Sequence, residues 1–298
     1  MSNSNKEACK ICGSGVWTQL YTGPIRQGKF GRAVPGIVWR CEQCGTGYLP
    51  PLARDLEQYY QSDAYRTDVG ETADVASFFA LHDAEQFPKY GLLAGLAPRS
   101  KVIADVGCAA GSFLDGLRGF AAETIGIEPA TFYHDSLRQR HHLVYPSTSD
   151  ALHDWQGRVD LVTCFSVIEH VVDPVGLLRE LRALLAEGGQ ALISTPNARD
   201  ILLQLGGDSY RSFFYRTVHL YYFDEDALRA AAQAAGFAHG EARYVHRFNF
   251  ANFAGWLREQ KPTGNERSTP LGAAFDQLWR GALEANGAAD YLYMFVRG

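Results

Sequence analysis

Four of the six cysteines form two equivalent short motifs near the N-terminus. Cys9 and Cys12 belong to one Cys-x2-Cys-Gly turn, and Cys41 and Cys44 belong to the other. A glycine after the second cysteine permits a left-handed backbone, so that both thiolates of a turn can face one ion. Two such turns supply four thiolates, the ligand set that structural Zn²⁺ prefers. We predict one structural zinc ion on these residues, in preference to two disulfides or four free thiols.

A second set of residues lies at a turn from a predicted strand to a predicted helix. Here Gly107 and Gly111 would let a ligand approach the backbone amides at the start of the helix. Such a turn alone is also compatible with a dinucleotide. The Gly-x3-Gly spacing, with Asp105 in front of it, favours a cationic, methionine-like group instead. Glu128 ends the next predicted strand, where its carboxylate could accept two hydrogen bonds from ribose hydroxyls.

Two histidines follow later predicted strands. His219 lies in an aromatic-rich segment after the fifth strand, and His170 lies after the fourth. Ligands of open α/β sheets bind at the carboxyl ends of the strands, and a neutral imidazole can take a proton near neutral pH. We predict His219 as a general base and His170 as the second candidate. A packed structural histidine is the alternative at both positions.

These motifs together resemble the class I S-adenosylmethionine-dependent methyltransferases over residues 101–298. The matching segments are 105–113, 127–129, 166–174, 188–189 and 194–197. The resemblance implies S-adenosylmethionine as the cofactor and an α/β fold with a Rossmann-like, seven-stranded, mostly parallel sheet. In that family the first loop holds the amino-acid end of the cofactor, and residues after the third strand flank the adenine. The cofactor contacts implied here are Asp105, Gly107, Cys108, Gly111, Phe113, Glu128, Ser149, Asp150 and Phe165.

The four-cysteine module before this core is similar to the arrangement in sugar methyltransferases of surface-polysaccharide and natural-product pathways. Sugar C-methyltransferases carry a Tyr-His-Glu-His-Leu-x-Tyr-Phe stretch, of which this chain keeps residues 219–223 and replaces the first three residues. The resemblance therefore implies a small-molecule acceptor, with a sugar or nucleotide-sugar favoured and O-methylation favoured over C- or N-methylation. Tyr215, Arg216 and Tyr222 are the candidates for holding the sugar or its phosphate.

Other function classes were weighed against this one. A nucleic-acid methyltransferase is disfavoured by the net charge of −5, which comes without a massed basic segment. The Asn/Asp-Pro-Pro-aromatic motif of base amino methylation is also missing, because residues 166–169 occupy its place. A phenolic acceptor stays open, and a non-catalytic binding module is disfavoured by the intact cofactor loop. We expect a cytoplasmic protein without a membrane span or a nucleic-acid partner. The oligomeric state stays open.

Three segments are expected along the chain. Residues 1–50 form the zinc ribbon, residues 51–97 a helical linker or lid, and residues 98–298 the methyltransferase domain with a helical insertion around 249–288. Strands are predicted at 102–106, 124–128, 159–165, 190–195, 238–247 and 291–296. Helices are predicted at 111–119, from Pro174 to a stop at Gly188-Gly189, and at 224–236.

Overall fold

The computed structural model describes residues 7–28, 30–51, 56–62, 64–69, 74–264 and 268–298. Parts of three predicted segments lie outside the described residues. These are 1–6 and 29 of the ribbon, 52–55, 63 and 70–73 of the helical linker, and 265–267 of the insertion. Within the described ranges, no helix combines the length and the apolar character that crossing a membrane requires.

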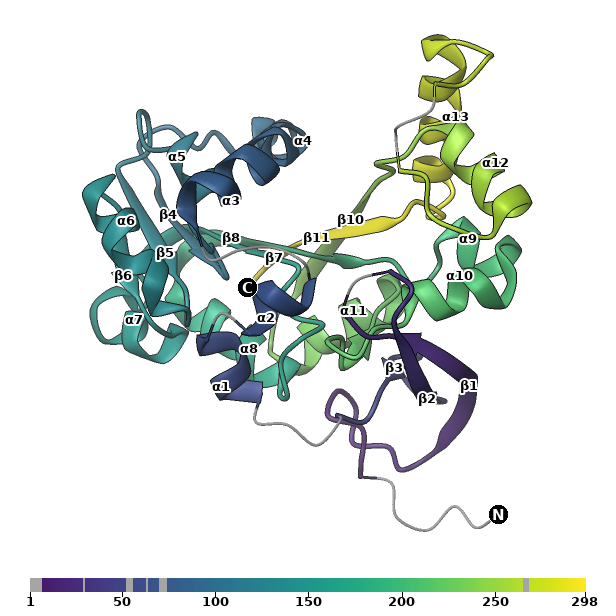
Figure 1. The fold of residues 1–298 in the computed structure, drawn as a ribbon. Coiled ribbons are helices and arrows are strands. Elements are labelled where there is room, and N and C mark those ends of the chain that lie inside the picture. Colours follow the sequence, from purple (N-terminus) through teal and green to yellow (C-terminus); the bar gives the residue numbers. More distant parts are fainter. Residues whose placement is uncertain (1–6, 29, 52–55, 63, 70–73, 265–267) are drawn as a thin grey trace.

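The main sheet joins seven described strands in the order β10-β11-β8-β7-β4-β5-β6 (Figure 1). Parallel pairing extends from β6 through β5, β4 and β7 to β8, and β11 runs antiparallel between β8 and β10. The predicted seven-stranded, mostly parallel sheet is therefore confirmed. The bounds are β4 (Val102–Val106), β5 (Glu123–Ile127), β6 (Leu143–Tyr145), β7 (Val159–Phe165), β8 (Leu185–Pro196), β10 (His239–Val245) and β11 (Tyr291–Arg297).

The central strands β4 and β7 have the predicted bounds. Helices cover both faces of a parallel sheet, so its strands are buried as continuous apolar runs, which are easy to recognise in a sequence. Ile103 and Val162 are fully buried examples. Strand β5 ends at Ile127, one residue before the predicted end. Glu128 therefore lies just beyond the strand, at the edge of the sheet where ligands bind.

Helix α8 (Pro174–Leu184) begins as predicted, because the Asp173 side chain accepts a backbone hydrogen bond in its first turn and proline opens the helix. The predicted stop at Gly188-Gly189 is wrong. The helix ends four residues before Gly188, and β8 already begins at Leu185. Gly188 has a φ of +75° in an irregular stretch where the pairing with β7 shifts, so the two glycines lie inside the strand.

Helix α5 (Ser112–Asp115) is shorter than the predicted 111–119. The hydroxyl of Tyr90 donates hydrogen bonds to the carbonyls of Ser112 and Phe113, at 3.2 and 3.0 Å. In a longer α-helix those carbonyls would accept from amides four residues further on. A side chain from a distant segment thus takes the place of the next helical turn.

A second sheet joins the N-terminal module to the core. Its order is β1-β2-β3-β9, with β1 (Trp17–Arg26), β2 (Ala33–Cys41) and β3 (Gly47–Tyr48) from the module. The last strand, β9 (Tyr221–Tyr222), comes from the predicted methyltransferase domain and pairs antiparallel with β3. The predicted three-segment division stays a proposal, and the two outer segments share this sheet.

The remaining helices connect and flank the two sheets. Figure 1 shows α9, α10, α12 and α13 gathered on one side of the molecule, beyond β10. The predicted insertion around 249–288 contains α12 and α13. The bounds are α1 (Leu56–Gln61), α2 (Ala64–Val69), α3 (Val75–His82), α4 (Phe87–Leu92), α6 (His134–Gln139), α7 (Thr148–Trp155), α9 (Ile201–Leu205), α10 (Gly207–Phe214), α11 (Glu225–Ala234), α12 (Phe250–Glu259) and α13 (Ala273–Ala285). Short 3₁₀ turns occupy Asp83–Gln86, Ala94–Leu96 and Thr131–Tyr133.

Candidate functional site

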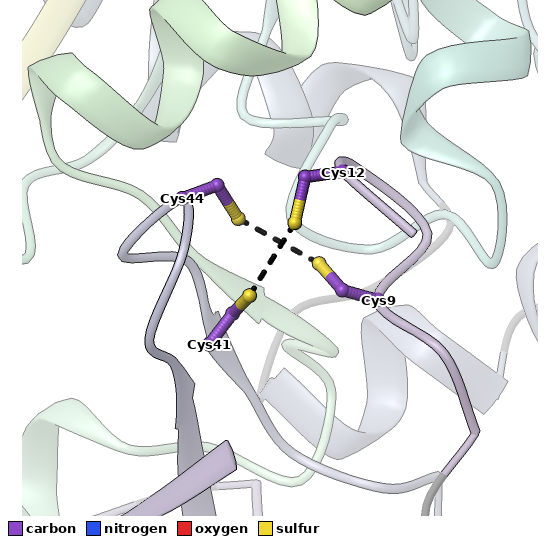
Figure 2. Close-up of side chains that lie close together, drawn as sticks. All are labelled: Cys9, Cys12, Cys41 and Cys44. Atoms are coloured by element: carbon purple, nitrogen blue, oxygen red, sulfur yellow. Dashed lines mark hydrogen bonds between the residues drawn. The ribbon is translucent and has the colours of Figure 1, made fainter. Parts of the chain in front are cut away.

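The four N-terminal cysteines converge on one point (Figure 2). Both Cys-x2-Cys turns close by backbone hydrogen bonds, from Gly13 to the Cys9 carbonyl and from Gly45 to the Cys41 carbonyl. The two glycines have φ values of +76° and +77°, the left-handed conformation that the motif predicts. All four cysteines are free of disulfides.

The distances between these sulfur atoms fit a tetrahedral metal ion. Cys9 Sγ lies 3.6 Å from Cys44 Sγ, and Cys12 Sγ lies 3.5 Å from Cys41 Sγ. Zinc–sulfur bonds of about 2.3 Å place the sulfurs of a tetrahedral site about 3.8 Å apart. A disulfide would need about 2.05 Å between sulfurs. The donor set therefore suits a metal ion with four protein ligands, which leaves no coordination position for a substrate.

A cavity of about 580 Å³ lies at the carboxyl ends of β4, β5 and β7. Its wall includes Gly107, which has a φ of +75°. A side chain at this glycine would collide with Val167 on the neighbouring loop. Ala109, where related loops often have glycine, adopts a φ of +48°, which costs an L-residue roughly 1–2 kcal/mol. Of the predicted cofactor contacts, the cavity wall contains Asp105, Gly107, Cys108, Phe113, Glu128 and Phe165.

The Glu128 carboxylate is held in place by the backbone. Its Oε2 accepts a hydrogen bond from the Ala109 amide at 2.8 Å, and its Oε1 accepts one from the Ala130 amide at 2.9 Å. A carboxylate has about four lone-pair sites, so each oxygen can accept one more hydrogen bond. Glu128 thus both ties the loop after β4 to the end of β5 and presents acceptors to the cavity.

Asp105 lies at the floor of the same cavity and is buried. Burial raises the pKa of its carboxyl to about 7, against the opposing effects of a hydrogen bond from Thr163 and the nearby Lys89 ammonium. The Thr163 hydroxyl donates to Asp105 Oδ1 at 2.6 Å. A further cation in the cavity would lower the pKa of the Asp105 carboxyl and so favour its ionised form.

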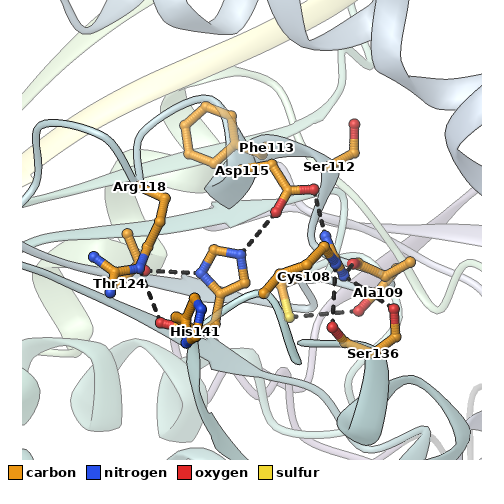
Figure 3. A network of polar contacts seen from close by, with 12 residues as sticks. Cys108, Ala109, Ser112, Phe113, Asp115, Arg118, Thr124, Ser136 and His141 are labelled. Atoms are coloured by element: carbon orange, nitrogen blue, oxygen red, sulfur yellow. Dashed lines mark hydrogen bonds and ion pairs between the residues drawn. The ribbon is translucent and has the colours of Figure 1, made fainter. Parts of the chain in front are cut away.

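A polar network supports the cofactor loop from behind (Figure 3). The His142 ring bridges Asp115 and Thr124 at 2.8 Å on each side. Arg140 pairs with Asp115 and also donates to the carbonyl of Ala110. These contacts connect the far side of the loop to α6 and β5, and they fix the backbone that faces the cavity.

Two histidines and a carboxylate lie together beside the cavity. The ligand atoms of Glu169, His170 and His219 lie within 4.8 Å of one another, so these residues could also hold a metal ion. The His170 and His219 rings meet edge to face, with centroids 4.8 Å apart. His170 is part of the cavity wall, whereas His219 packs behind it and does not reach that wall.

The hydrogen bonds of His170 assign its tautomer. Its Nδ1 lies 2.8 Å from the carbonyl of Val218, which can only accept, so Nδ1 carries the hydrogen. The hydroxyl of Tyr60 lies 2.9 Å from the same nitrogen. In the neutral ring Nε2 is then the proton acceptor. Burial and the charges of His170, Arg216 and Arg26 lower the pKa of His219 well below its usual value, so that ring is neutral.

Comparison with known proteins identifies the family. Residues 81–240, more than half of the chain, match the family model of a methyltransferase domain. The chain belongs to this methyltransferase family. It is therefore an S-adenosylmethionine-dependent methyltransferase.

Two curated relatives match parts of the methyltransferase. A ubiquinone biosynthesis O-methyltransferase of Azotobacter vinelandii is 31% identical over 153 residues, 47% of this chain and 66% of that protein. A tRNA U34 carboxymethyltransferase of Campylobacter curvus is 26% identical over 200 residues, 62% of this chain and 60% of that protein. The methyltransferase thus spans less than two thirds of the length of either relative.

A solved structure shares the fold. It is a methyltransferase of Thermotoga maritima described as a possible histamine N-methyltransferase. The TM-score is 0.51 at 17% identity, and the match covers 74% of this chain and 92% of the other. At this identity the likeness concerns the fold alone, and it agrees with the Rossmann-like sheet described above.

Three predicted cofactor contacts of the methyltransferase do not form the cavity wall. Gly111, with a φ of +89°, caps α5 from behind the loop. Ser149 and Asp150 lie in the first turn of α7. The Ser149 hydroxyl donates a hydrogen bond to Glu180, and the Asp150 backbone amide donates one to the Ser147 hydroxyl, which caps the helix. Ser147 and Thr148 contribute to the wall in their place. The N-terminal end of α7 thus forms this part of the cavity wall, and the adenine contacts stay a prediction.

The three predicted substrate residues also lie away from this wall. Tyr215 is buried and stacks on Tyr21 of β1, with centroids 5.0 Å apart. The Tyr222 hydroxyl accepts a hydrogen bond from the Arg216 amide at 2.8 Å and donates one to the Arg216 carbonyl at 3.2 Å. The two bonds fix the turn before β9. The two tyrosines therefore position the loop that carries His219 and Arg216.

The sequence did not reveal the contribution of the helical linker. Tyr60, Phe78, Gln86 and Lys89 all reach the cavity wall, although they lie before the first strand of the main sheet. The Lys89 ammonium lies 4.8 Å from the centroid of the Phe165 ring. A lone lysine or tyrosine in an amphipathic helix carries no motif, so only the three-dimensional arrangement identifies these residues.

Proposed function

We propose that this methyltransferase transfers the methyl group of S-adenosylmethionine to a hydroxyl oxygen of a small molecule in the 580 Å³ cavity. The observation that carries the proposal is the tautomer of His170, which in the neutral ring leaves Nε2 as the proton acceptor. The ring belongs to the cavity wall, and Nε2 lies 4.0 Å from Glu169 Oε1. Methyl transfer from a sulfonium to a hydroxyl releases a proton, and an acceptor of this kind can take it. The Azotobacter relative is an O-methyltransferase, which agrees with this reaction.

Within this site the two histidines have different roles. His170 takes the proton from the acceptor hydroxyl through Nε2, while Val218 and Tyr60 keep Nδ1 engaged. His219 packs against His170 and stays neutral, so it does not repel the proton that His170 receives. This reverses the order expected from the sequence, in which His219 was the preferred base.

The cofactor occupies the part of the cavity beside β4 and β5. Glu128 accepts hydrogen bonds from the ribose hydroxyls, and Asp105 faces the cationic methionine end. S-adenosylmethionine supplies an electrophilic methyl group there. Phe113, Phe165 and Phe78 line the cavity and exclude water from the reacting atoms.

The metal centre has a structural role in this proposal. Cys9, Cys12, Cys41 and Cys44 hold one Zn²⁺ ion, for which the sulfur–sulfur distances are suitable. The ion keeps the two cysteine turns at the base of the β1-β2-β3-β9 sheet in place. It has no part in methyl transfer, because four protein ligands complete its shell.

For the acceptor we propose a sugar or nucleotide-sugar, and the competing class is a phenol. A panel of nucleotide-sugars, free sugars and catechols is incubated with the enzyme and cofactor, and products are examined by mass spectrometry. A gain of one methyl group on a hydroxyl of a sugar supports the proposal, and product from catechols alone moves the acceptor to phenols. A tRNA sample tests the nucleic-acid alternative, since one relative bears a tRNA name.

The same assay separates the two histidines. His170→Gln should lower kcat by about 10²–10⁴-fold, the range for a lost general base, with unchanged cofactor affinity. His219→Gln should lose less, because its ring supports His170 without contacting the cavity. Equal losses of kcat in His170→Gln and His219→Gln, together with a second metal ion per chain in elemental analysis, would instead favour the metal-binding arrangement of Glu169 and the two histidines.

A further inference from the structure

Two arginines from distant segments lie side by side without a counter-ion. Arg26 ends β1, and Arg216 follows α10. Their backbones form a parallel bridge, with Arg26 N donating to the Tyr215 carbonyl at 2.8 Å and Thr217 N donating to the Arg26 carbonyl at 3.0 Å. The fold therefore brings the two guanidinium groups to one place.

Both side chains contain an orphaned polar atom. The Nε atoms of Arg26 and Arg216 are buried and have no hydrogen-bond partner. In the described part of the chain, neither guanidinium has a carboxylate within ion-pair distance. Burial, and next the charge of Arg216, lower the pKa of Arg26 to about 9. Two neighbouring, half-buried guanidinium groups without a counter-ion repel each other, and an anion bound between them would relieve that repulsion.

Arg26 lines a second cavity, and Arg216 lies near the histidine cluster beside the first cavity. Arg26 lies over the Phe213 ring, 4.1 Å from its centroid, in the wall of a second cavity of about 440 Å³. The charge of Arg216 acts on Glu169 and His219, the groups beside His170 and the first cavity. The acid of the second cavity, Asp208, is already paired with Arg211 at 2.9 Å.

We propose that Arg26 and Arg216 bind a phosphate or diphosphate group of the methyl acceptor. The inference rests on the proposed function, because it assigns the far end of the molecule whose hydroxyl meets His170. Guanidinium groups bind phosphate oxygens through paired N–H donors, and two positive charges match a phosphate ester with about −1.5 to −2 charge. The hydroxyl of Ser212 in the second cavity is a further donor, whereas that of Ser209 already donates to the Gln260 carbonyl at 2.6 Å. The metal-binding module thereby contributes a residue to the acceptor site.

Calorimetry with inorganic pyrophosphate tests the site on the full, zinc-containing chain. Arg26→Gln and Arg216→Gln should each weaken pyrophosphate binding at least tenfold. Arg297→Gln removes the same charge from an exposed position at the C-terminal end of β11 and should bind like the wild type. Unchanged binding in both site variants, or no binding to the wild type, overturns the inference.

Thermal unfolding provides a second measurement and shows whether a substitution has impaired folding. Without anion, Arg26→Gln should be at least as stable as the wild type, because it removes one of two neighbouring like charges. Pyrophosphate should raise the melting midpoint of the wild type and not that of the variant. Citrate at equal ionic strength distinguishes carboxylates, and citrate binding as tight as that of pyrophosphate would overturn the assignment to phosphate.

The inference and the proposed function can fail separately. Pyrophosphate binding that depends on Arg26, in an enzyme that methylates no hydroxyl of the panel, would support the anion site and refute the proposed function. Methylation of a phosphate-bearing acceptor with equal kcat/KM in the wild type and Arg26→Gln, together with pyrophosphate binding that the substitution leaves unchanged, would support the proposed function and overturn the anion site.

Discussion

At the scale of single residues, Glu128 combines a structural and a binding role. Its two oxygens accept backbone hydrogen bonds from Ala109 and Ala130, so the carboxylate is oriented before any cofactor arrives. A preorganised acceptor loses little freedom on binding, which favours affinity. The position just past β5 was predictable from the sequence, but the two amide contacts were not.

Replacement of Glu128 should therefore affect both binding and stability. Glu128→Ala should weaken S-adenosylmethionine binding by about 1.5–3 kcal/mol, the range for hydrogen bonds to a charged group. It also leaves two loop amides without their acceptor, so its unfolding free energy should fall. Calorimetry and denaturant unfolding measure the two effects. Glu123→Gln, at the other end of the same strand, is the matched control. Wild-type affinity in Glu128→Ala would refute the site.

Asp105 makes the protein sensitive to pH. Its pKa is about 7 in the folded chain and about 3.8 when exposed, so the folded chain retains a proton that the unfolded chain releases in between. Its contribution to stability is thus greatest below about pH 4 and declines as the pH rises to about 7. Asp105→Asn should remove this decline. Denaturant unfolding of both proteins between pH 4 and 8 measures the difference.

The cofactor should have the opposite pH dependence. Its cationic amino group favours ionised Asp105, so cofactor affinity should rise from pH 5 to about 7 and then level off. In Asp105→Asn the affinity should be lower and nearly constant. A parallel rise in both proteins would show that another group titrates.

At the scale of elements, the helical linker determines features of the core that its own sequence does not predict. Helix α5 ends after one turn, where the Tyr90 hydroxyl of α4 donates to the carbonyls of Ser112 and Phe113. The Tyr90 ring also stacks on Phe113, with centroids 5.3 Å apart. Strands β4 and β7 were predictable because each is a continuous apolar run. The end of α5 was not, because the decisive contact comes from a segment more than twenty residues away.

Tyr90→Phe isolates this contact, because the ring stays and only the hydroxyl is lost. The hydroxyl has a single proton, which the two carbonyls share, so this one hydrogen bond predicts a loss of about 0.5–1.5 kcal/mol in the free energy of unfolding. Cofactor affinity should also fall, because Phe113 and the cofactor loop belong to the same turn. Tyr293→Phe is a control, since no hydrogen bond of the Tyr293 hydroxyl occurs among the described residues. Equal effects in both variants would contradict this role.

At the scale of the whole molecule, the four-cysteine module and the loop that carries His219 are joined by one sheet. Gly47 and Tyr48 of β3 pair with Tyr222 and Tyr221 of β9. The pair of cysteine motifs was recognisable in the sequence because its spacing is local. The pairing of β3 with β9 was not, because two-residue strands carry no periodicity and their partners are far apart in the chain.

Loss of the metal should therefore lower the activity of the methyltransferase as well as the stability of the module. Cys9→Ser should abolish stoichiometric zinc, measured by elemental analysis, whereas Lys10→Ser in the same turn should retain it. A loss of about 2 kcal/mol would lower the melting midpoint by roughly 4–8 °C for a chain of this size. Methyl transfer should fall as well, because the loop that carries His219 pairs with the module. Full activity in a zinc-free variant would disprove this coupling.

The pairing of β3 with β9 also has a consequence for the order of folding. During synthesis the cysteines of residues 9–44 leave the ribosome first and can assemble their turns early. The module cannot complete its sheet until residues 221–222 have been made, when most of the main sheet already exists. Contacts between such distant segments form late, since a long loop must close first. We therefore expect the nascent module to present an open β3 edge, which the emerging core then covers.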